Sequence, residues 1–586
     1  MIDLKATPAT ESLLFLFFRR MRVPLVVLIS AYAIATLGFT LVPGVDDEGN
    51  PWRMTLFEAF YVVSYTGSTI GFGEVPYEFT AAQRMWTIAS IYLTVVAWLF
   101  SIGSIISLLQ DPVYARALRQ ARLARSVRAM SQPFYLVCGY GDTGRMLTRA
   151  LTARGHPVVL MEQKREKIET LAVEDLGASV TGFALDARMP EHLVSAGLRS
   201  RWCAGVLAVT GDDQANLKIA ISARLLNHKV TVHARAGSRE VAQNMRSFET
   251  DHVVSPVDEY CRRLRLALEQ PDLYRLYHWM LSGPGAALPK HLELPRGPWI
   301  VCGFGRVGRA VWRTLTEAGI ETRLIDPHPD REDRPDGTIR GTGTQAETLE
   351  EAGIGTAAGI VAATSDDADN LSILVTAESL NPDLYLAALE NGLSSHDLFE
   401  AAEPDFVAQP STVTAGTMLG RIASPLIGPF IDELLKAGNE SARDLLACLL
   451  KHQDDRPPAL TAGRISANRS PAVARAIERG EAVTVGMLLT DPRDRERRLP
   501  LEALLIKRGD ENELCPPDDR ELELGDRLLL GGRRGAARRV GSTLENDHSL
   551  DYVRTGIDHQ RGWVWRWLQK NGAAPAPEGH GGEPRG

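Results

Sequence analysis

Hydrophobic positions divide the chain into an apolar N-terminal part and a long mixed remainder. Residues 23–42 and 85–109 carry no charged side chain, and each run is long enough for a helix to cross a hydrocarbon layer about 30 Å thick. A third apolar stretch, residues 54–65, lies between them and is too short to cross. The pattern predicts two membrane spans with a short helix between them. A signal peptide is the alternative for the first run, but no small-residue cleavage site follows it.

Basic residues flank the two spans on the same predicted side of the membrane. Three arginines precede the first span, whereas the segment between the spans is acidic. Five more arginines follow the second span at three-residue spacing: Arg116, Arg119, Arg122, Arg125 and Arg128. Because basic flanks stay in the cytoplasm, the pattern predicts a multi-pass protein of the cell (inner) membrane with both termini cytoplasmic. The arginine row either contacts anionic lipid headgroups or forms a solvated helix face.

A glycine-punctuated segment, residues 66–76, follows the short middle helix. Non-helical backbone at membrane depth persists only where it is buried in protein or lines a polar cavity. Glycines at alternate positions allow unusual backbone angles, so that successive carbonyls can point toward one axis. A ring of such carbonyls replaces the water shell of K⁺. The segment is therefore predicted to be a re-entrant pore loop.

Residues 68–74, Ser-Thr-Ile-Gly-Phe-Gly-Glu, resemble the potassium-channel signature Thr-Val-Gly-Tyr-Gly-Asp. The resemblance implies that the permeant K⁺ is bound by the filter residues Thr69, Ile70, Gly71, Phe72 and Gly73. Since one chain supplies one filter strand and the ring needs four, a homotetramer in the lipid bilayer is expected. Phe72 lacks the hydroxyl of the usual tyrosine and Glu74 is longer than the usual aspartate. These changes leave a weakly selective cation channel as an alternative.

The gate is expected outside the spans. Neither span carries arginines at every third position, so the charge movement of a voltage sensor has no basis here. Gly103 inside the second span is either a hinge or a helix-packing position. The remaining sequence must therefore supply the signal that opens or closes the pore.

A dinucleotide-binding pattern opens the remainder of the chain. An apolar strand from Phe134 leads into a GxGxxG loop and a helix, and a second strand ends at the acidic Glu162. The glycines allow close approach of phosphates to the helix N-terminus, and the acid can bind ribose hydroxyls. The loop comprises the candidate ligand residues Gly139, Tyr140, Gly141, Asp142, Thr143 and Gly144.

The same pattern recurs further along the chain. A second glycine-rich loop comprises Gly303, Phe304, Gly305, Arg306, Val307 and Gly308, and its second strand ends at Asp326. The segment 206–217, which contains Thr210, matches the segment 360–371, which contains Thr364, at an offset of 154 residues. An internal duplication of two Rossmann-like, doubly wound α/β lobes is therefore predicted.

Two such lobes behind a two-span pore resemble the regulator-of-K⁺-conductance (RCK) family, which is related to the TrkA-type nucleotide-binding subunits. The resemblance covers residues 20–110 and most of 134–540. It implies that the eight lobes of a tetramer form a cytoplasmic ring. Ligand binding is expected to change the shape of this ring, which then pulls on the inner helices of the pore. Asp186 lies in the family's Gly-Asp-Ala element, where the second copy has Gln345. The two lobes are therefore not expected to be equivalent.

The resemblance also organises the rest of the chain. Residues 257–281 are expected to form a crossover helix, 411–452 a longer helical stretch, and 481–490 with 522–530 part of a β-rich C-terminal subdomain. Trp563, Trp565 and Trp567 either anchor the tail or pack locally, and the end from Gly572 is predicted to be disordered. The expected divisions are 1–22, 23–110 (pore), 111–133 (connector), 134–281 (first lobe), 282–297 (linker), 298–460 (second lobe), 461–545 (C-terminal subdomain) and 546–586 (tail).

Composition and single residues limit the possible ligands and argue against nucleic-acid binding and zinc binding. The net charge of −8 argues against a nucleic-acid partner, and the six cysteines include no CxxC pair of the kind that binds zinc. Glu162 and Asp326 favour an unphosphorylated ribose, hence NAD(H) or an adenine nucleotide as regulatory ligand. Ca²⁺ held by aspartates is the alternative, and its candidate ligands are Asp186, Asp212, Asp213, Asp366 and Asp367.

Two classes of catalyst or carrier fit the sequence less well. An NAD-dependent oxidoreductase needs a second domain that carries acid–base groups over the nicotinamide, and a second nucleotide lobe stands in its place. A secondary transporter needs many spans, and only two are predicted. A ligand-gated channel, not an enzyme, is therefore the expected function.

Overall fold

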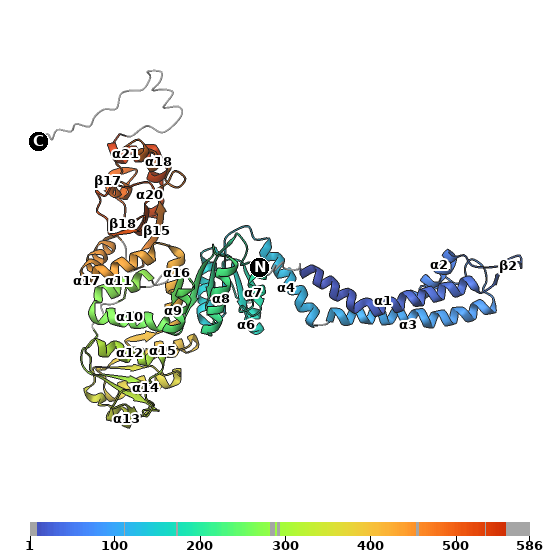
Figure 1. The fold of residues 1–586 in the computed structure, drawn as a ribbon, viewed down its shortest axis with the longest axis horizontal. Coiled ribbons are helices and arrows are strands. Elements are labelled where there is room, and N and C mark those ends of the chain that lie inside the picture. Colours follow the sequence, from blue (N-terminus) through green and yellow to red (C-terminus); the bar gives the residue numbers. More distant parts are fainter. Residues whose placement is uncertain are drawn as a thin grey trace, which may run out of the picture. The chain divides into compact units, whose positions relative to one another are not determined.

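The computed structural model describes residues 9–110, 112–171, 174–281, 287–289, 294–452, 456–533 and 535–557. The tryptophans of the tail and most of the expected linker 282–297 lie outside these residues. Two long apolar helices confirm the predicted spans: α1 (Ala9–Leu41) and α3 (Ala81–Gln110). They run side by side, with the short α2 (Leu56–Gly67) at one end of the pair (Figure 1). Helix α4 (Pro112–Arg128) follows α3.

Helix α2 begins at a capping box. The Thr55 hydroxyl accepts a hydrogen bond from the Glu58 N–H, and the Glu58 carboxylate accepts one from the Thr55 N–H. Behind the helix, Phe39, Val62 and Phe79 are buried in a common core. A short antiparallel pair, β1 (Gly44–Val45) and β2 (Pro51–Trp52), lies in the loop between α1 and α2. The buried face of α2 fixes where the filter segment starts.

Two six-stranded sheets confirm the duplicated Rossmann-like fold. The first has the order β5-β4-β3-β6-β7-β8 and the second the order β11-β10-β9-β12-β13-β14, which is the doubly wound order with the first strand in the middle. The strands of the first sheet are β3 (Phe134–Cys138), β4 (Val158–Glu162), β5 (Val180–Ala184), β6 (Cys203–Ala208), β7 (Thr231–Arg235) and β8 (His252–Val254). Those of the second are β9 (Trp299–Cys302), β10 (Thr322–Asp326), β11 (Ile339–Arg340), β12 (Gly359–Ala362), β13 (Tyr385–Leu389) and β14 (Phe406–Ala408).

Both faces of the second sheet are covered. Trp299 and Val301 on β9 pack into one apolar core, and the alternating Ile300 and Cys302 pack into another. All pairs in this sheet are parallel, and a parallel sheet buried on both faces requires such continuous hydrophobic strands. The helices of the first lobe are α5 (Asp142–Ala153), α6 (Arg165–Thr170), α7 (Pro190–Ser195), α8 (Asp213–Leu226) and α9 (Arg239–Ser247). Those of the second lobe are α12 (Arg306–Glu317), α13 (Ala346–Glu351), α14 (Asp367–Leu380) and α15 (His396–Ala401), with short 3₁₀ turns at Ile354–Thr356 and Leu393–Ser395.

The helices that follow each sheet pack on the other copy. Helix α10 (Pro256–Glu269) follows β8 and packs against α12, while α16 (Pro410–Ala423) follows β14 and packs against α5. The prediction of a single crossover helix over 257–281 is wrong, because helix α10 ends at Glu269 and a separate helix, α11 (Pro271–Leu281), starts at Pro271. Proline has no N–H to continue the preceding helix. Helix α17 (Ile427–His452) is kinked at Gly438, where φ is +80°.

The C-terminal subdomain is more helical than expected. Its antiparallel sheet has the order β15-β20-β18-β19, formed by Ala459–Arg464, Arg527–Gly532, Leu501–Arg508 and Glu511–Leu514, beside the hairpin β16 (Thr490–Asp491) and β17 (Asp494–Arg498). Residues 485–489, assigned to a β-rich region from the sequence, form helix α19. The described residues also form α18 (Pro471–Glu478), α20 (Ala536–Glu545) and α21 (Asp547–Thr555), the last within the segment 546–586 that was predicted to be a tail.

A histidine pair with one buried member makes the stability of the first lobe pH-dependent. His233 on β7 is buried against His252 on β8, with ring centroids 4.7 Å apart. Burial, followed by the charges of His252 and Arg421, lowers the pKa of His233 from 6.5 to about 3. The unfolded chain therefore binds the proton that the folded chain rejects, and stability falls as the pH drops from 6.5 toward 3.

Because of the low pKa of His233, the free energy of unfolding should fall by about 2 kcal/mol when the pH drops from 6.5 to 5. Thermal unfolding of the purified protein at constant ionic strength measures the effect, and His233→Gln should flatten the pH dependence. The exposed His228 provides the control, since His228→Gln should leave the slope unchanged. An unchanged slope in His233→Gln would contradict the assignment.

Candidate functional site

The filter segment has an alternating backbone. Thr69, Gly71 and Gly73 have positive φ angles of 62°, 65° and 97°, as the glycine spacing predicted for the last two. Such angles suit glycine and are rare for other residues. Between them, the side chains of Ile70 and Phe72 are 62% and 63% exposed in the single chain. The two apolar side chains of the segment are therefore only partly covered by their own chain.

A tyrosine of α2 supports the C-terminal end of the filter segment. The Tyr65 hydroxyl donates a hydrogen bond of 2.6 Å to the carbonyl of Gly73. Its ring lies edge to face with that of Phe72, with 5.7 Å between the ring centroids, and the Tyr61 ring stacks on Phe72 with 6.4 Å between the centroids. Tyr65 thus supplies a hydroxyl behind the filter, which Phe72 cannot. The sequence reasoning missed this residue, whose signal is an aromatic side chain one helical turn before Thr69.

Glu74 is fixed just after the filter. Its Oε1 accepts a hydrogen bond from Arg84 Nε at 2.8 Å, and its Oε2 accepts one from Arg84 Nη2 at 3.1 Å. The backbone N–H of Phe79 also donates to Oε2 at 2.7 Å. Paired guanidinium–carboxylate bonds of this kind fix orientation. The longer side chain is therefore anchored to α3 rather than loose.

The three glycines of each glycine-rich loop have separate functions. Gly139 and Gly303 have φ angles of +106° and +91°, which make the tight turn. A Cβ on Gly308 would lie 1.9 Å from the Gly303 carbonyl oxygen, so this glycine permits close packing. A Cβ on Gly141 or Gly305 would meet nothing within 4 Å. The middle glycine therefore borders open space at the helix N-terminus, where a phosphate group binds in nucleotide folds.

The helix N-termini at these loops carry no side-chain cap. Both α5 and α12 have a glycine at the N-cap, so that within the described part of the chain neither helix has a side-chain cap. Uncapped N–H groups combine with the helix dipole to attract anions. Each loop therefore retains the donors that a phosphate requires.

Thr210 and Thr364 form hydrogen bonds within their own lobes, in the loops after β6 and β12. The N–H and hydroxyl of Thr210 donate to the side-chain oxygen of Asn216 at 2.9 and 2.8 Å. Thr364 makes the same bonds to Asn370 at 2.9 and 2.8 Å. Both asparagines are fully buried. The two threonines therefore fix the loops after β6 and β12 in identical ways.

The aspartates proposed for Ca²⁺ have other functions. Asp212 and Asp366 cap α8 and α14 by accepting N–H bonds of 2.9 and 2.8 Å. Asp186 is paired with Arg188 at 2.8 Å, and this guanidinium lowers the pKa of Asp186. Within the described part of the chain, no three His, Cys, Asp or Glu residues are grouped as metal ligands. The geometry therefore does not support the Ca²⁺ alternative.

The acidic residue of the second lobe is buried and fully engaged. Asp326, 5% exposed, accepts hydrogen bonds of 2.9 Å from the backbone N–H groups of Phe304 and His328. Arg334 lies 3.3 Å from the same carboxylate. Burial alone would raise the pKa of Asp326, but these donors together lower it. Asp326 is thus brought to the glycine-rich loop as a carboxylate.

Arginines surround the ring of Phe304 in the same loop. Arg309 and Arg334 lie over it at 5.2 and 5.0 Å from the ring centre. A cavity of about 760 Å³ opens beside them and is lined by Gly305, Asp326 and Arg331. This volume is within the range of small-molecule sites. The second lobe therefore offers a basic cavity at its glycine-rich loop.

The first lobe differs at the equivalent positions. The Tyr140 hydroxyl donates a hydrogen bond of 3.0 Å to Glu174, and burial with this bond raises the pKa of Tyr140 to about 12. Glu162, at the end of β4, accepts a bond of 2.9 Å from the Lys164 N–H and is only half-buried. The two lobes thus differ in how deeply the acidic residue is buried, since Glu162 is half-buried and Asp326 is buried, as well as at Gln345.

Removal of Arg334 should destabilise the second lobe. In Arg334→Ala the buried carboxylate of Asp326 loses its cationic partner, which typically costs about 3 kcal/mol or more. Hydrogen exchange of the β10 amides should therefore rise in this variant. Arg331→Ala, at an exposed position in the same cavity, should leave the exchange unchanged. Equal exchange in both variants would contradict the importance of the pair.

The residue after the middle glycine contacts the other copy. Asp142 of the first loop accepts a hydrogen bond of 3.3 Å from the Leu393 N–H. The equivalent Arg306 of the second loop places its Nη1 only 2.6 Å from the point where a Cβ on Gly237 would lie, and Asp213 accepts a 2.8 Å bond from the Gly237 N–H. Each glycine-rich loop therefore lies against the opposite copy.

Comparisons with known proteins agree with this division. Residues 24–111 match the family model described as "Ion channel", and residues 135–256 and 299–410 match the TrkA-N domain. Potassium channel protein 1 of Methanocaldococcus jannaschii is 22% identical over 39% of this chain and 66% of the relative. Probable potassium channel protein 2 of the same organism is 30% identical over 25% of this chain and 43% of the relative. The chain thus spans less than two thirds of either relative.

A solved structure described as the GsuK channel bound to NAD shares 17% identity over 91% of this chain and 99% of that chain, with a TM-score of 0.43. The family matches show an ion-channel domain followed by two TrkA-N domains, hence a membrane protein with regulatory domains rather than an enzyme.

Proposed function

We propose that the chain forms a K⁺-selective channel whose opening is controlled by nucleotide binding to the two TrkA-N lobes. The observation that carries this proposal is the filter segment. Its alternating backbone at Thr69, Gly71 and Gly73 lies between two spans and is supported from behind by Tyr65. The two relatives named as potassium channel proteins favour the same ion.

A homotetramer completes the proposed site. A carbonyl ring that replaces the hydration shell of K⁺ requires four filter strands, and this chain contains one. The exposure of Ile70 and Phe72 in the single chain favours cover by neighbouring copies. The proposed K⁺ ligands are Thr69, Ile70, Gly71, Phe72 and Gly73. The arginines that flank the spans favour a cytoplasmic location for the lobes and both termini.

The regulatory ligand is proposed to be NAD(H) or an adenine nucleotide. Its phosphates would lie at Gly141 and Gly305, which border open space at uncapped helix N-termini. Its ribose would be bound near Glu162 or Asp326. Asp326 already has three donors, so the second lobe must give up Arg334 or bind the ribose differently. A ligand that favours one arrangement of the lobes would shift the pore between open and closed.

Single-channel recording in a lipid bilayer tests both parts. With K⁺ on one side and Na⁺ on the other, a reversal potential near the K⁺ limit is expected. NAD⁺, NADH, ADP and ATP are added in turn to the side that bears the lobes, and one of them should change the open probability. Equal K⁺ and Na⁺ currents would refute the selectivity, and a response to none of these nucleotides would refute the gating.

A further inference from the structure

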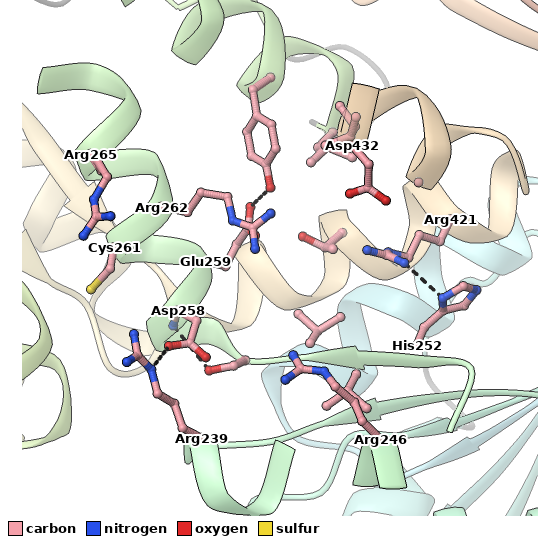
Figure 2. Close-up of a pocket in the computed structure, with 18 of the residues that line it drawn as sticks. Arg239, Arg246, His252, Asp258, Glu259, Cys261, Arg262, Arg265, Arg421 and Asp432 are labelled. Atoms are coloured by element: carbon pink, nitrogen blue, oxygen red, sulfur yellow. Dashed lines mark hydrogen bonds and ion pairs between the residues drawn. The ribbon is translucent and has the colours of Figure 1, made fainter. Parts of the chain in front are cut away.

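A second cavity, of about 780 Å³, contains no residue of either glycine-rich loop (Figure 2). Its walls come from β8 and α9 of the first lobe, from α10 and α11, from α12 of the second lobe, and from α16 and α17. It is rich in guanidinium groups, which belong to Arg239, Arg246, Arg262, Arg265, Arg313 and Arg421.

Most acidic side chains around the cavity already have partners. Asp258 is paired with Arg239 at 2.8 Å, and Glu317 is paired with Arg265. Glu259 accepts a hydrogen bond of 2.6 Å from Tyr277 and is paired with Arg263 at 3.3 Å. These contacts use up Arg239 and Arg265 among the cavity arginines.

Asp251 is also engaged, because it accepts a 2.8 Å bond from the Val232 N–H and is paired at 3.9 Å with Arg224, which does not line the cavity. Asp432, which is exposed, is the one further carboxylate among the described residues that line the cavity. The acids therefore cannot neutralise the remaining arginines.

Four guanidinium groups are left without a carboxylate. Within the described part of the chain, Arg246, Arg262 and Arg313 form no ion pair, and Arg421 donates a 3.0 Å hydrogen bond to Nδ1 of His252. Burial and the charge of Arg421 lower the pKa of His252, so its imidazole accepts this bond as a neutral group. The bond therefore orients Arg421 without compensating its charge.

Arg246, Arg262 and Arg421 line the same cavity from three different elements, α9, α10 and α16 (Figure 2). Like charges that face one cavity repel one another, and a bound anion removes this repulsion. The planar fork of arginine binds phosphate and carboxylate oxygens in pairs. The arrangement is thus suited to an oxyanion that carries several negative charges.

We infer that this cavity is a separate regulatory site for a small multivalent oxyanion of the kind carried by phosphorylated metabolites, held by Arg246, Arg262 and Arg421. Because the walls come from both copies and from the exchanged helices α10 and α16, the bound anion would tie them together. The inference stands independently of the nucleotide sites at the glycine-rich loops.

The test uses inorganic pyrophosphate as the probe and the purified full-length channel in detergent. Calorimetric titration at low ionic strength should show saturable binding. Binding to the double variant Arg262→Gln/Arg421→Gln should be weaker by about ten-fold or more, since two charge-assisted hydrogen-bond donors are lost. Arg262 is exposed, so the single variant Arg262→Gln should fold normally and show part of the loss.

Two matched variants separate this site from others. Arg475→Gln removes an exposed, ion-paired arginine of the C-terminal subdomain and should leave binding unchanged. Gly141→Ala/Gly305→Ala blocks the phosphate positions proposed at the glycine-rich loops, so the pyrophosphate binding that this variant retains is assigned to the cavity. Absence of binding to the unaltered channel, or wild-type binding by Arg262→Gln/Arg421→Gln, would overturn the inference. Loss of binding in the glycine variant alone would do the same.

Discussion

Tyr65→Phe should lower the preference of the channel for K⁺ over Na⁺ by about ten-fold. The variant removes the hydroxyl that donates a 2.6 Å hydrogen bond to the Gly73 carbonyl. A hydrogen bond of this kind contributes about 1 kcal/mol, and the proposed tetramer would lose it in each copy. Without it, the outer filter strand can move, and a site that can contract no longer rejects the smaller ion. The shift of reversal potential under K⁺/Na⁺ gradients measures the effect.

Tyr61→Phe is the matched control for this prediction. Tyr61 lies one turn earlier on α2 and stacks on Phe72 through its ring, which phenylalanine retains. Its selectivity should equal that of the unaltered channel. If Tyr65→Phe also retained full selectivity, the hydrogen bond behind the filter would have no part in ion choice, and the rigidity would have to come from the Glu74–Arg84 pair.

Gly141→Ala and Gly305→Ala should weaken nucleotide binding at their own lobes while leaving the fold intact. Both glycines have ordinary negative φ angles, −83° and −69°, and an added Cβ would meet no protein atom within 4 Å. The same methyl group would occupy the space that a phosphate needs at the helix N-terminus. We expect a loss of affinity of more than about ten-fold, equivalent to 1.4 kcal/mol, measured by calorimetry for each variant separately.

Two further glycine variants serve as controls for the loss of nucleotide affinity. Gly355→Ala adds a methyl group to open space in a 3₁₀ turn outside both loops and should leave nucleotide affinity unchanged. Gly308→Ala should instead unfold the loop, because its Cβ would lie 1.9 Å from the Gly303 carbonyl. Thermal unfolding distinguishes the two classes. Unaltered affinity in both Gly141→Ala and Gly305→Ala would mean that the nucleotide binds elsewhere.

The parts of the fold that depend on periodicity were predictable from the sequence. The two spans, the short pore helix and the duplicated strand-loop-helix units follow from apolar runs and from glycines that recur at fixed spacing, and the structure contains all of them. The break between α10 and α11 was missed although Pro271 was visible, because the apolar pattern continues across it. The residues 485–489 were misassigned because a short apolar run fits a helix or a strand equally well.

The site was predictable where backbone geometry demands glycine, and not where distant side chains meet. The positive φ angles of Gly71, Gly73, Gly139 and Gly303 follow from local sequence. The Tyr65–Gly73 bond and the Arg334–Asp326 pair depend on how a loop folds back. Asp212 and Asp366 were candidate Ca²⁺ ligands although aspartate at such a turn is more often a helix cap, and the folded chain shows that they cap α8 and α14.

The contact of Arg306 with Gly237 has a consequence for the history of the duplication. At an offset of 154 residues, Gly237 corresponds to Asn391. Arg306 fits because Gly237 has no side chain, since a Cβ there would lie 2.6 Å from its guanidinium. Two second copies could not associate through the same geometry, because the side chain of Asn391 would occupy the space of the arginine. The once-identical halves have thus become complementary and can no longer be exchanged for one another.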